Sequence, residues 1–197
     1  MQMKDSNIEY YNQNADSFYE SSVEADMSEW QKRFLQYIPS GGRILDVGCG
    51  SGRDSKAFIK QGYSVVAFDA SREMCKRASE LLGQEVWQMR FDEMSFDDEF
   101  DGVWACASLL HVGDNDLPDI FKKIHKALKE DGIIYASFKY GDGEKERGER
   151  SFIDFTEESI EPILLMSGFE IVDSGITSDI RPGRENEKWT NVVAKKC

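Results

Sequence analysis

The sequence has few basic residues, and this shortage limits the partners it can bind. Its 24 lysines and arginines are outnumbered by 37 aspartates and glutamates, which gives a formal net charge of −13 at pH 7. Binding a nucleic acid through its phosphates needs a concentrated basic patch, and no basic run of that density occurs along the chain. We therefore expect no nucleic acid among the partners.

Cysteine and histidine are also scarce. The chain has four cysteines, each isolated from the others: Cys49, Cys75, Cys106 and Cys197. They form no C-x-x-C pair and do not cluster with His111 or His125, the only two histidines. Metal centres and disulfide frameworks need such groupings, so we predict neither, and we expect all four thiols to be reduced.

Long apolar runs are absent as well. No stretch approaches the roughly 18–20 consecutive apolar residues of a membrane-spanning helix. The first residues, Met1–Tyr11, lack the basic-then-apolar layout of a secretory signal peptide. The sequence thus predicts a cytoplasmic protein that has no membrane partner.

The chain does contain enough apolar residues for a core. Of its 197 residues, 40 % are hydrophobic and 12 % are aromatic, a composition that argues against wholesale disorder. A typical domain has about 100–200 residues, so we expect a single domain that spans residues 1–197.

From Arg43 onward, short apolar runs alternate with helical patterns. The predicted strands are Arg43–Val47, Ser64–Phe68, Val86–Met89, Asp101–Ala107 and Gly132–Phe138. The predicted helices between them are Ser51–Gln61, Arg72–Leu82 and Leu117–Leu128. Strands that are apolar on both faces and separated by helices form a parallel sheet covered on both sides, so we expect an α/β fold.

The segments on either side of this core have a different character. Helical spacing of apolar residues predicts helices over Ser6–Glu20 and Glu29–Ile38, so residues 1–40 are interpreted as a helical lid over the sheet edge. After the core, Gly141–Arg150 is charged, interrupted by glycine and devoid of apolar residues. That segment is predicted to be a mobile loop.

The last part of the chain, residues 141–197, is interpreted as the substrate side of the domain. A helix is expected from Thr156 to about Met166, with Gly168 as its stop signal. Two strands follow, Phe169–Ile176 and Lys188–Lys195, joined by a turn that contains Pro182-Gly183. Because no crossover helix separates them, we expect an antiparallel hairpin at the end of the sheet.

The most informative segment is a buried strand that runs directly into a glycine-rich turn, Asp46-Val47-Gly48-Cys49-Gly50-Ser51-Gly52. In an open parallel sheet, ligands bind beyond the carboxyl ends of the strands, and the first strand normally borders that place. Gly48, Gly50 and Gly52 lack a Cβ, so the backbone can turn with positive φ and approach a ligand closely. We therefore expect a ligand at this turn.

Acidic residues also follow the second and third predicted strands. Asp69 comes one βαβ unit after Asp46, and a carboxylate there can accept two hydrogen bonds from a ribose diol. The alternative interpretation of Asp69 is a helix N-cap. After the third strand, Asp92 is a candidate partner for an adenine amino group, with Phe91 or Met94 packed on the ring. Asp69 and Asp92 therefore both predict a nucleoside ligand.

The glycine spacing distinguishes between the classes of nucleotide or nucleoside ligand that such a turn can bind. A dinucleotide fingerprint requires G-x-G-x-x-G, but Gly52 comes one residue too early, and no G-K-[ST] follows for a P-loop. The run D-V-G-C-G-S-G, followed by an acid after each of the next two strands, resembles instead the class I S-adenosylmethionine-dependent methyltransferases. More loosely, the Tyr10-Tyr11-x-x-x-Ala15 opening is similar to small bacterial methyltransferases of the tellurite-resistance type.

This resemblance covers about Arg43 to Phe138 and implies a single-domain Rossmann-like methyltransferase fold, with a mainly parallel seven-stranded sheet. Residues 41–140 would be the core that binds S-adenosylmethionine as cofactor. By the resemblance, Gly48 and Gly50 face the methionine portion and Asp46 assists through its amino group. Asp69 would then bind the ribose and Asp92 the adenine. The remaining predicted cofactor contacts are Tyr11, Cys49, Gly52, Ala70, Met74, Phe91 and Ala107.

His111 is the candidate catalytic residue. It follows the fourth strand, where the family places residues that face the substrate, and an imidazole can take a proton from a hydroxyl nucleophile near neutral pH. The alternative is a structural histidine that caps a loop. Four arginines in the late loops can bind a substrate carboxylate or phosphate, or simply face solvent: Arg147, Arg150, Arg181 and Arg184.

The sequence therefore predicts an enzyme that transfers a methyl group from S-adenosylmethionine, in line, to a small molecule. The segment Ala105–Ser108 replaces the N-P-P-Y type of stretch that accompanies methylation of nucleobases or glutamine, which argues against those substrates. Two alternatives stay open: a cofactor-binding regulatory or partner subunit without catalysis, and a nicotinamide-dependent oxidoreductase, which the glycine spacing disfavours.

Overall fold

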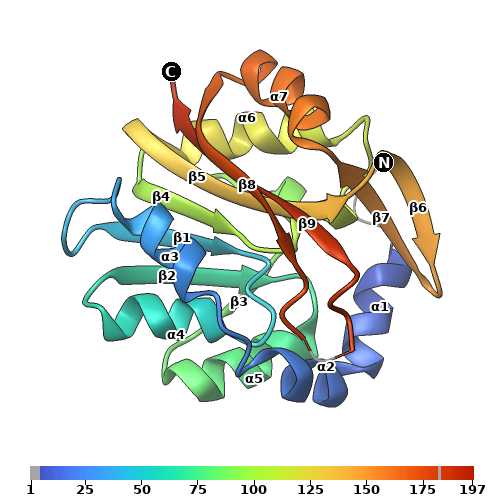
Figure 1. Cartoon of the computed structure of the whole chain (residues 1–197). Helices are drawn as coiled ribbons and strands as arrows, with labels where there is room; N and C mark the ends of the chain where they lie inside the picture. The colour runs from blue at the N-terminus through green and yellow to red at the C-terminus, as the bar shows by residue number, and fades with distance from the viewer. Residues whose placement is uncertain (1–4, 182) are drawn as a thin grey trace.

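Six strands of a mixed β-sheet run parallel, and the last of them along the chain is β7 (Arg150–Phe155), which pairs with β5. The computed structural model describes residues 5–181 and 183–197, arranged as shown in Figure 1. The other five parallel strands are β1 (Arg43–Val47), β2 (Ser64–Asp69), β3 (Trp87–Gln88), β4 (Phe100–Ala105) and β5 (Leu128–Tyr140). They lie in the order β3-β2-β1-β4-β5. This order reverses between β1 and β4, where an open α/β sheet leaves a crevice for a ligand.

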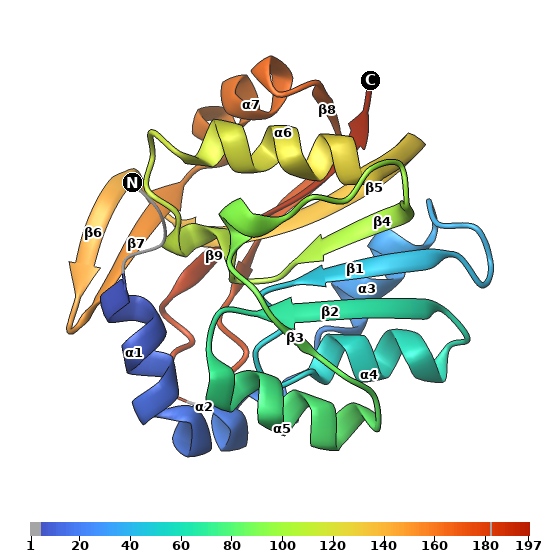
Figure 2. The ribbon, with the colours of Figure 1, turned by 180° about the vertical axis from the view of Figure 1, so that it is seen from behind.

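Helices cover both faces of the sheet, as predicted (Figures 1 and 2). They are α1 (Asp5–Gln13), α2 (Ala15–Ser22), α3 (Ser28–Leu35), α4 (Arg53–Lys60), α5 (Arg72–Leu82), α6 (Leu117–Ala127) and α7 (Glu157–Met166). On one face, the rings of Phe34 in α3 and Phe58 in α4 each lie 5.2 Å from Trp104 of β4. On the other face, α6 and α7 bury Phe121 and Leu164. The central strands β1 and β4 are therefore buried on both faces, which explains their continuous apolar sequences, whereas the short edge strand β3 is exposed.

The C-terminal strands form the predicted antiparallel pair. β8 (Phe169–Ser178) runs antiparallel to β9 (Lys188–Lys196), and β9 also pairs with β5 from Ile133↔Lys195 to Lys139↔Trp189. The predicted helix start at Thr156 is confirmed, because its backbone N–H donates to Ser159 Oγ in a capping box. Of the predicted turn between the strands, Pro182 lies outside the described residues.

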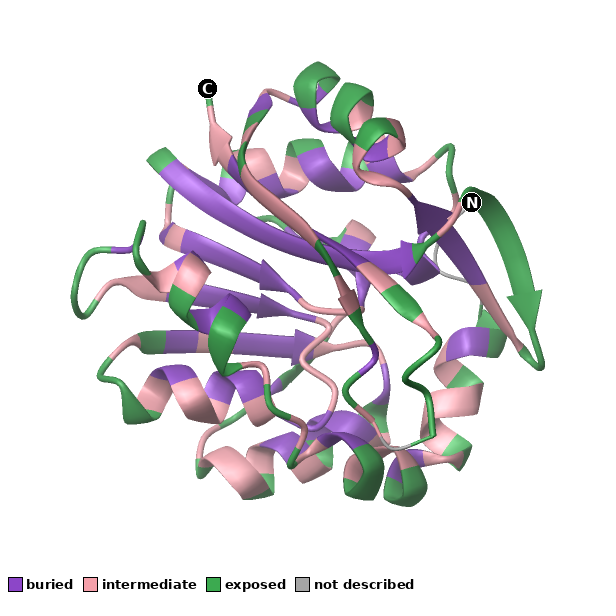
Figure 3. Ribbon diagram, in the orientation of Figure 1, coloured by how far each residue is buried: buried purple, intermediate pink, exposed green. Residues whose placement is uncertain are grey.

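The segment predicted as a mobile loop is instead a β-hairpin. β6 (Gly143–Arg147) and β7 (Arg150–Phe155) pair antiparallel, so the described residues form nine strands rather than the seven expected. All of β6 is exposed (Figure 3), which is why it lacks an apolar pattern. Its geometry is held by backbone pairing and by the Arg147 guanidinium, which donates to the buried carboxylate of Asp154.

Residues 5–35 form three helices rather than the two predicted for this region, and of these α1 and α2 lie over the sheet edge. The third, α3, packs on a face of the sheet, where Trp30 is 4 % and Phe34 0 % exposed. α3 is therefore part of the core and not of a lid. α1 contacts the hairpin: Asn7 Nδ2 donates to the Ser151 carbonyl (3.2 Å), and Ser151 N–H donates to Asn7 Oδ1 (3.0 Å).

None of the helices formed by residues 5–181 and 183–197 has the length and apolar character needed to cross a bilayer. The cytoplasmic location stays a prediction.

Candidate active site

A cavity of about 570 Å³ opens at the carboxyl ends of the parallel strands. It is bordered by the turn after β1, the ends of β2 and β4, helices α1 and α2, and the hairpin β6–β7. This volume falls within the roughly 300–1,000 Å³ of small-molecule sites. The predicted ligand position and the cavity therefore coincide.

The turn after β1 can be built only with glycine at its first bend. Gly48 has a φ of +72°, and a Cβ added there would lie 2.6 Å from Ser108 Cβ, which is a severe overlap. The N–H groups of Gly48 and Cys49 both donate to the Phe68 carbonyl at 3.0 Å. The turn is thereby tied to β2, and its backbone lines the cavity at Gly48, Cys49 and Gly50.

Asp69 ends β2 and lies beside this turn. Its two carboxylate oxygens accept the N–H groups of Gly50 (2.9 Å) and Ser71 (2.8 Å). Burial raises the pKa of Asp69, while the backbone donors, Ser71 foremost, counteract this rise. The alternative of an N-cap role does not apply, because Ser71 caps α5 by accepting from Met74 N–H. Asp69 thus presents a fixed carboxylate to the cavity.

Asp46 is a second acid on the same wall. It is 2 % exposed and accepts a hydrogen bond from Ser55 Oγ at 2.6 Å. Burial, together with the nearby Asp54 carboxylate, raises the pKa of Asp46 to about 7. A cationic group placed in the cavity beside Asp46 would favour its ionised form. The site therefore has an acidic end suited to an ammonium group.

Replacing Asp46 by asparagine should stabilise the free protein at high pH. The carboxyl titrates near pH 3.9 in an unfolded chain and near pH 7 in the folded one, so the free energy of unfolding falls as pH rises between these values. Above pH 7 the charge costs up to about 4 kcal/mol. Thermal unfolding should show a higher melting temperature for Asp46→Asn at pH 8 and no gain at pH 4. Equal stability at pH 8 would contradict the raised pKa.

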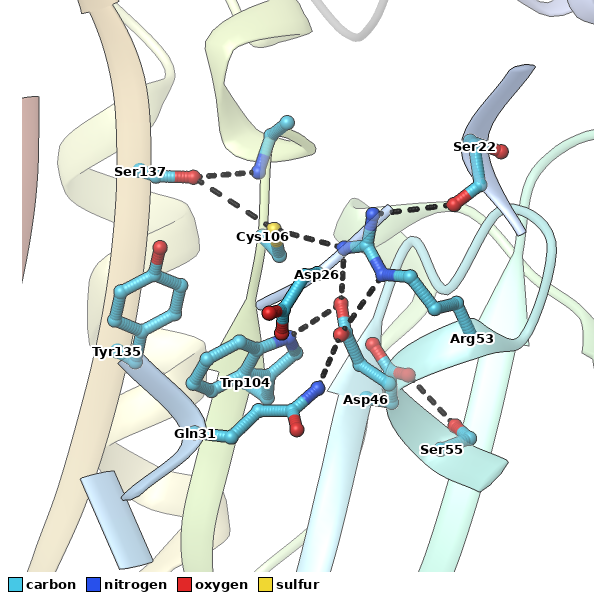
Figure 4. A network of polar contacts seen from close by, with 12 residues as sticks. Ser22, Asp26, Gln31, Asp46, Arg53, Ser55, Trp104, Cys106, Tyr135 and Ser137 are labelled. Carbon is cyan, nitrogen blue, oxygen red and sulfur yellow. Dashed lines mark hydrogen bonds and ion pairs between the residues drawn. The ribbon is translucent and has the colours of Figure 1, made fainter. Parts of the chain in front are cut away.

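A buried polar network supports the floor of the acidic end (Figure 4). The Asp54 carboxylate accepts hydrogen bonds from three side chains: Gln31 Nε2 at 2.7 Å, Trp104 Nε1 at 3.0 Å and Arg53 Nη2 at 2.6 Å. Burial lowers the pKa of Arg53, but the Asp54 carboxylate has the larger effect and holds this pKa above its usual range. The network joins α3, α4 and β4, so it fixes the turn that precedes α4.

Ala107 lies just beyond β4 in a conformation rarely adopted by residues other than glycine. Its φ is +51°, and its N–H donates to Ser137 Oγ of β5 at 2.8 Å. Both residues line the cavity. Backbone of this kind costs about 1–3 kcal/mol and concentrates at functional sites, so the position agrees with the predicted contact at Ala107.

His111 lies on the opposite wall and is buried. Its Nδ1–H donates to the Ser151 carbonyl (2.9 Å), which leaves Nε2 as an acceptor for the Tyr11 hydroxyl, also at 2.9 Å. We assign this tautomer because the carbonyl can only accept and is nearer to Nδ1 than the Asn7 amide nitrogen, which lies at 3.3 Å. Burial lowers the pKa of His111 to about 4, and the positive charge of Arg150 adds to the effect. The imidazole is therefore neutral near pH 7, with its lone pair directed at Tyr11.

The structure brings most of the predicted site residues to one cavity. These are Tyr11, Asp46, Gly48, Cys49, Gly50, Asp69, Ala70, Met74, Phe91, Ala107 and His111. Two predicted contacts lie outside its lining. Gly52 is the N-cap of α4, and its Cα faces α5, where an added Cβ would lie 3.1 Å from Ala78 Cβ. The Asp92 carboxylate pairs with Arg90 at 3.4 Å.

Several lining residues were not predicted. They come from the end of β5, from β7, and from β9 with the connection that precedes it: Lys139, Phe152, Asp179, Glu187, Trp189 and Asn191. In β7 the only apolar signal is the short run Phe152-Ile153 with Phe155, which is too brief to mark a strand by its period. Three of the four late arginines are paired, Arg147 with Asp154, Arg181 with Asp179 and Arg184 with Glu187.

Comparison with known proteins identifies a domain in the centre of the chain. Residues 44–132 match the family model described as a methyltransferase domain. The putative methyltransferase YqeM of Bacillus subtilis is 31 % identical over 126 residues, which cover 58 % of this chain and 51 % of that protein. The 2-methyl-6-phytyl-1,4-hydroquinone methyltransferase of Synechocystis is also 31 % identical over 126 residues. These residues cover 61 % of this chain and 39 % of that protein. The chain thus spans about half or less of the length of these curated relatives.

Solved structures extend the likeness to nearly the whole fold. A Burkholderia thailandensis 1,6-didemethyltoxoflavin-N1-methyltransferase, with its substrate and S-adenosylhomocysteine bound, has a TM-score of 0.80 at 22 % identity and covers 97 % of this chain and 86 % of its own. The magnesium protoporphyrin IX methyltransferase of Synechocystis, with S-adenosylmethionine bound, scores 0.71 at 17 % identity, with 98 % of each chain covered. A [4+2]-cyclase, SpnF, has a TM-score of 0.74 at 16 % identity and covers 95 % of this chain and 94 % of its own. At these identities the likeness establishes the fold, and the cyclase indicates that the fold alone does not define the reaction.

Proposed function

We propose that the protein binds S-adenosylmethionine and methylates a small molecule, because residues 44–132 match a methyltransferase domain and the fold is that of class I methyltransferases. The observation that carries the proposal is the joint placement of the Gly48 turn and the Asp69 carboxylate on the wall of one large cavity. A nicotinamide-dependent oxidoreductase fits less well, since the dinucleotide glycine pattern is absent and Gly52 packs against a helix.

The residues around the turn suit the polar groups of this cofactor. We expect both ribose hydroxyls to donate to Asp69, whose oxygens are already held in place by two backbone N–H groups. Asp46 would pair with the methionine ammonium, and the nearby Met74 and Phe91 would pack against the adenine. When bound, S-adenosylmethionine supplies a methyl group on a sulfonium, which is an excellent leaving group.

Because the leaving group needs little help, the chain has to align the acceptor and exclude water. Helices α1 and α2 are suited to this task as a lid. The rings of Tyr11 and Phe18 lie 5.0 Å apart, and Phe18 is 3.3 Å from the position that a Cβ on Gly50 would occupy. Both rings line the cavity, where aromatic faces attract a positively charged sulfonium.

We assign His111 the role of proton acceptor for a hydroxyl or N–H nucleophile. Its Nε2 faces the Tyr11 hydroxyl at 2.9 Å. As the substrate is methylated, the proton of its hydroxyl or N–H group would pass to the Tyr11 oxygen. The proton of Tyr11 would move to Nε2 of His111 at the same time. The Ser151 carbonyl holds Nδ1–H and keeps the ring in the tautomer that this transfer needs.

The proposal is tested by turnover. Wild-type protein is incubated with methyl-labelled S-adenosylmethionine and a panel of small metabolites, and S-adenosylhomocysteine formation is measured against a control without acceptor. We expect acceptor-dependent product formation and label in one class of metabolite. Tight cofactor binding without turnover across the panel would instead favour a regulatory or partner subunit. A thermal shift by NAD but not by S-adenosylmethionine would favour the oxidoreductase.

A further inference from the structure

One cation on the cavity wall differs from its neighbours. Six basic side chains of the described residues line the cavity, and five are paired with carboxylates: Arg53 with Asp54, Lys139 and Arg181 with Asp179, Arg147 with Asp154, and Arg184 with Glu187. The sixth, Arg150, makes no ion pair with any carboxylate in residues 5–181 and 183–197. It is therefore a candidate binding group.

Arg150 is enclosed mainly by aromatic rings. Its guanidinium carbon lies 4.5 Å from the ring centroid of Tyr10, 5.0 Å from Phe152 and 5.8 Å from Tyr11. Nη1 donates to the Tyr11 hydroxyl at 3.2 Å, whereas Nε is buried and has no hydrogen-bond partner. Aromatic faces offset part of the cost of enclosing a charge, but a poorly solvated cation still favours a counter-ion.

Within the part of the chain that the structure describes, no carboxylate forms an ion pair with Arg150. The net charge of −13 provides many carboxylates, yet Asp154 of the hairpin is engaged by Arg147, and Asp179 on the cavity wall is engaged by both Lys139 and Arg181. The two acids on the opposite wall, Asp46 and Asp69, are held by Ser55 and by backbone N–H groups. An anion at Arg150 would therefore have to come from a ligand.

We propose, resting on the function proposed above, that the methyl acceptor is a small aromatic acid whose anionic group pairs with Arg150. A guanidinium binds a carboxylate with paired N–H groups in one plane, which fixes the orientation of the bound acid. The rings of Tyr11 and Phe152 provide apolar walls on which an aromatic acceptor can stack.

This placement would put the methyl acceptor next to His111, the proposed proton acceptor. Arg150 and His111 share the Tyr11 hydroxyl, which receives from Nη1 and donates to Nε2. The charged and titratable groups facing His111 are Tyr11 from α1 and Arg150 from β7. A bound anion would neutralise the charge of Arg150 and so make protonation of His111 easier, which couples recognition of the acid to the transfer of its proton.

The test compares matched acids and amides on the S-adenosylhomocysteine-loaded protein. The probes are the three hydroxybenzoates and the corresponding hydroxybenzamides, added at millimolar concentration and followed by thermal shift and calorimetry. We expect at least one acid to bind the wild type more tightly than its amide. In Arg150→Gln the acid should bind about 10- to 100-fold more weakly, the amide should be unaffected, and Arg150→Lys should restore part of the affinity.

Arg184→Gln is the matched control, since Arg184 also lines the cavity but pairs with Glu187 at 3.9 Å. It should keep the preference for the acid. No preference for any acid in the wild type, or a preference that persists in Arg150→Gln, overturns the proposal. If S-adenosylhomocysteine itself fails to bind, the proposed function fails, and the same acid and amide titrations on the free protein still test Arg150.

Discussion

We expect the Asp69→Asn variant to bind S-adenosylhomocysteine about 10- to 100-fold more weakly than the wild type. Hydrogen bonds to a charged group contribute about 1.5–3 kcal/mol, and asparagine offers one uncharged acceptor oxygen in place of two charged ones. Each Asp69 oxygen also holds a backbone N–H, of Gly50 or of Ser71. The amide NH₂ would face one of these donors, so the turn should loosen as well. Isothermal titration calorimetry measures the change directly.

Asp92→Asn is the matched control for this substitution. Asp92 follows the third parallel strand as Asp69 follows the second, but it does not contribute to the cavity lining formed by the described residues. Its asparagine variant should bind S-adenosylhomocysteine within about twofold of the wild type, well under the 1.4 kcal/mol of a tenfold change. Equal losses in both variants would show that Asp69 has no special role at the ribose.

The second large effect is expected at His111. We expect His111→Gln to lower kcat by about 10²- to 10³-fold, the usual contribution of a positioned base, while affinity for S-adenosylhomocysteine stays unchanged. Glutamine can still donate an N–H to the Ser151 carbonyl, but it cannot carry the proton that Nε2 would accept from Tyr11. Steady-state turnover with an acceptor found in the metabolite panel measures the loss.

His125→Gln provides the comparison. His125 lies on α6, and its Nε2 is 3.4 Å from the Cys197 carbonyl, away from the cavity lining. This variant should turn over like the wild type. Unimpaired kcat in His111→Gln would assign His111 a structural role between α1 and the hairpin, and a loss of S-adenosylhomocysteine binding would point to a collapsed site.

Features fixed by local sequence were predictable. Each central strand is buried on both faces, so its apolar run stands out, and the turn after β1 needs glycine for its positive φ at Gly48. Asp46 and Asp69 sit at strand ends, where one βαβ unit sets their separation. The hairpin was not predictable in the same way, because β6 is exposed at every residue and depends on its pairing with β7.

The substrate side of the cavity depends on contacts between distant segments. Asn7 and His111 meet across 104 residues, and Tyr11 and Arg150 across 139. No periodic pattern within either segment encodes such a contact. The two helices predicted before the first strand were both assigned to a lid, although α3 packs on a face of the sheet and only α1 and α2 pack at its edge. An apolar stripe shows that a helix packs against something, but not which surface it packs against.

Binding of S-adenosylmethionine tests most directly whether the glycine turn and Asp69 form a site for this cofactor. Calorimetric titration of the purified, folded protein should give one site per chain, with a dissociation constant on the order of 10 μM, and NAD should give no heat under the same conditions. If circular dichroism confirms an intact fold and neither S-adenosylmethionine nor S-adenosylhomocysteine binds at millimolar concentration, the assignment of the glycine turn and Asp69 to this cofactor is contradicted.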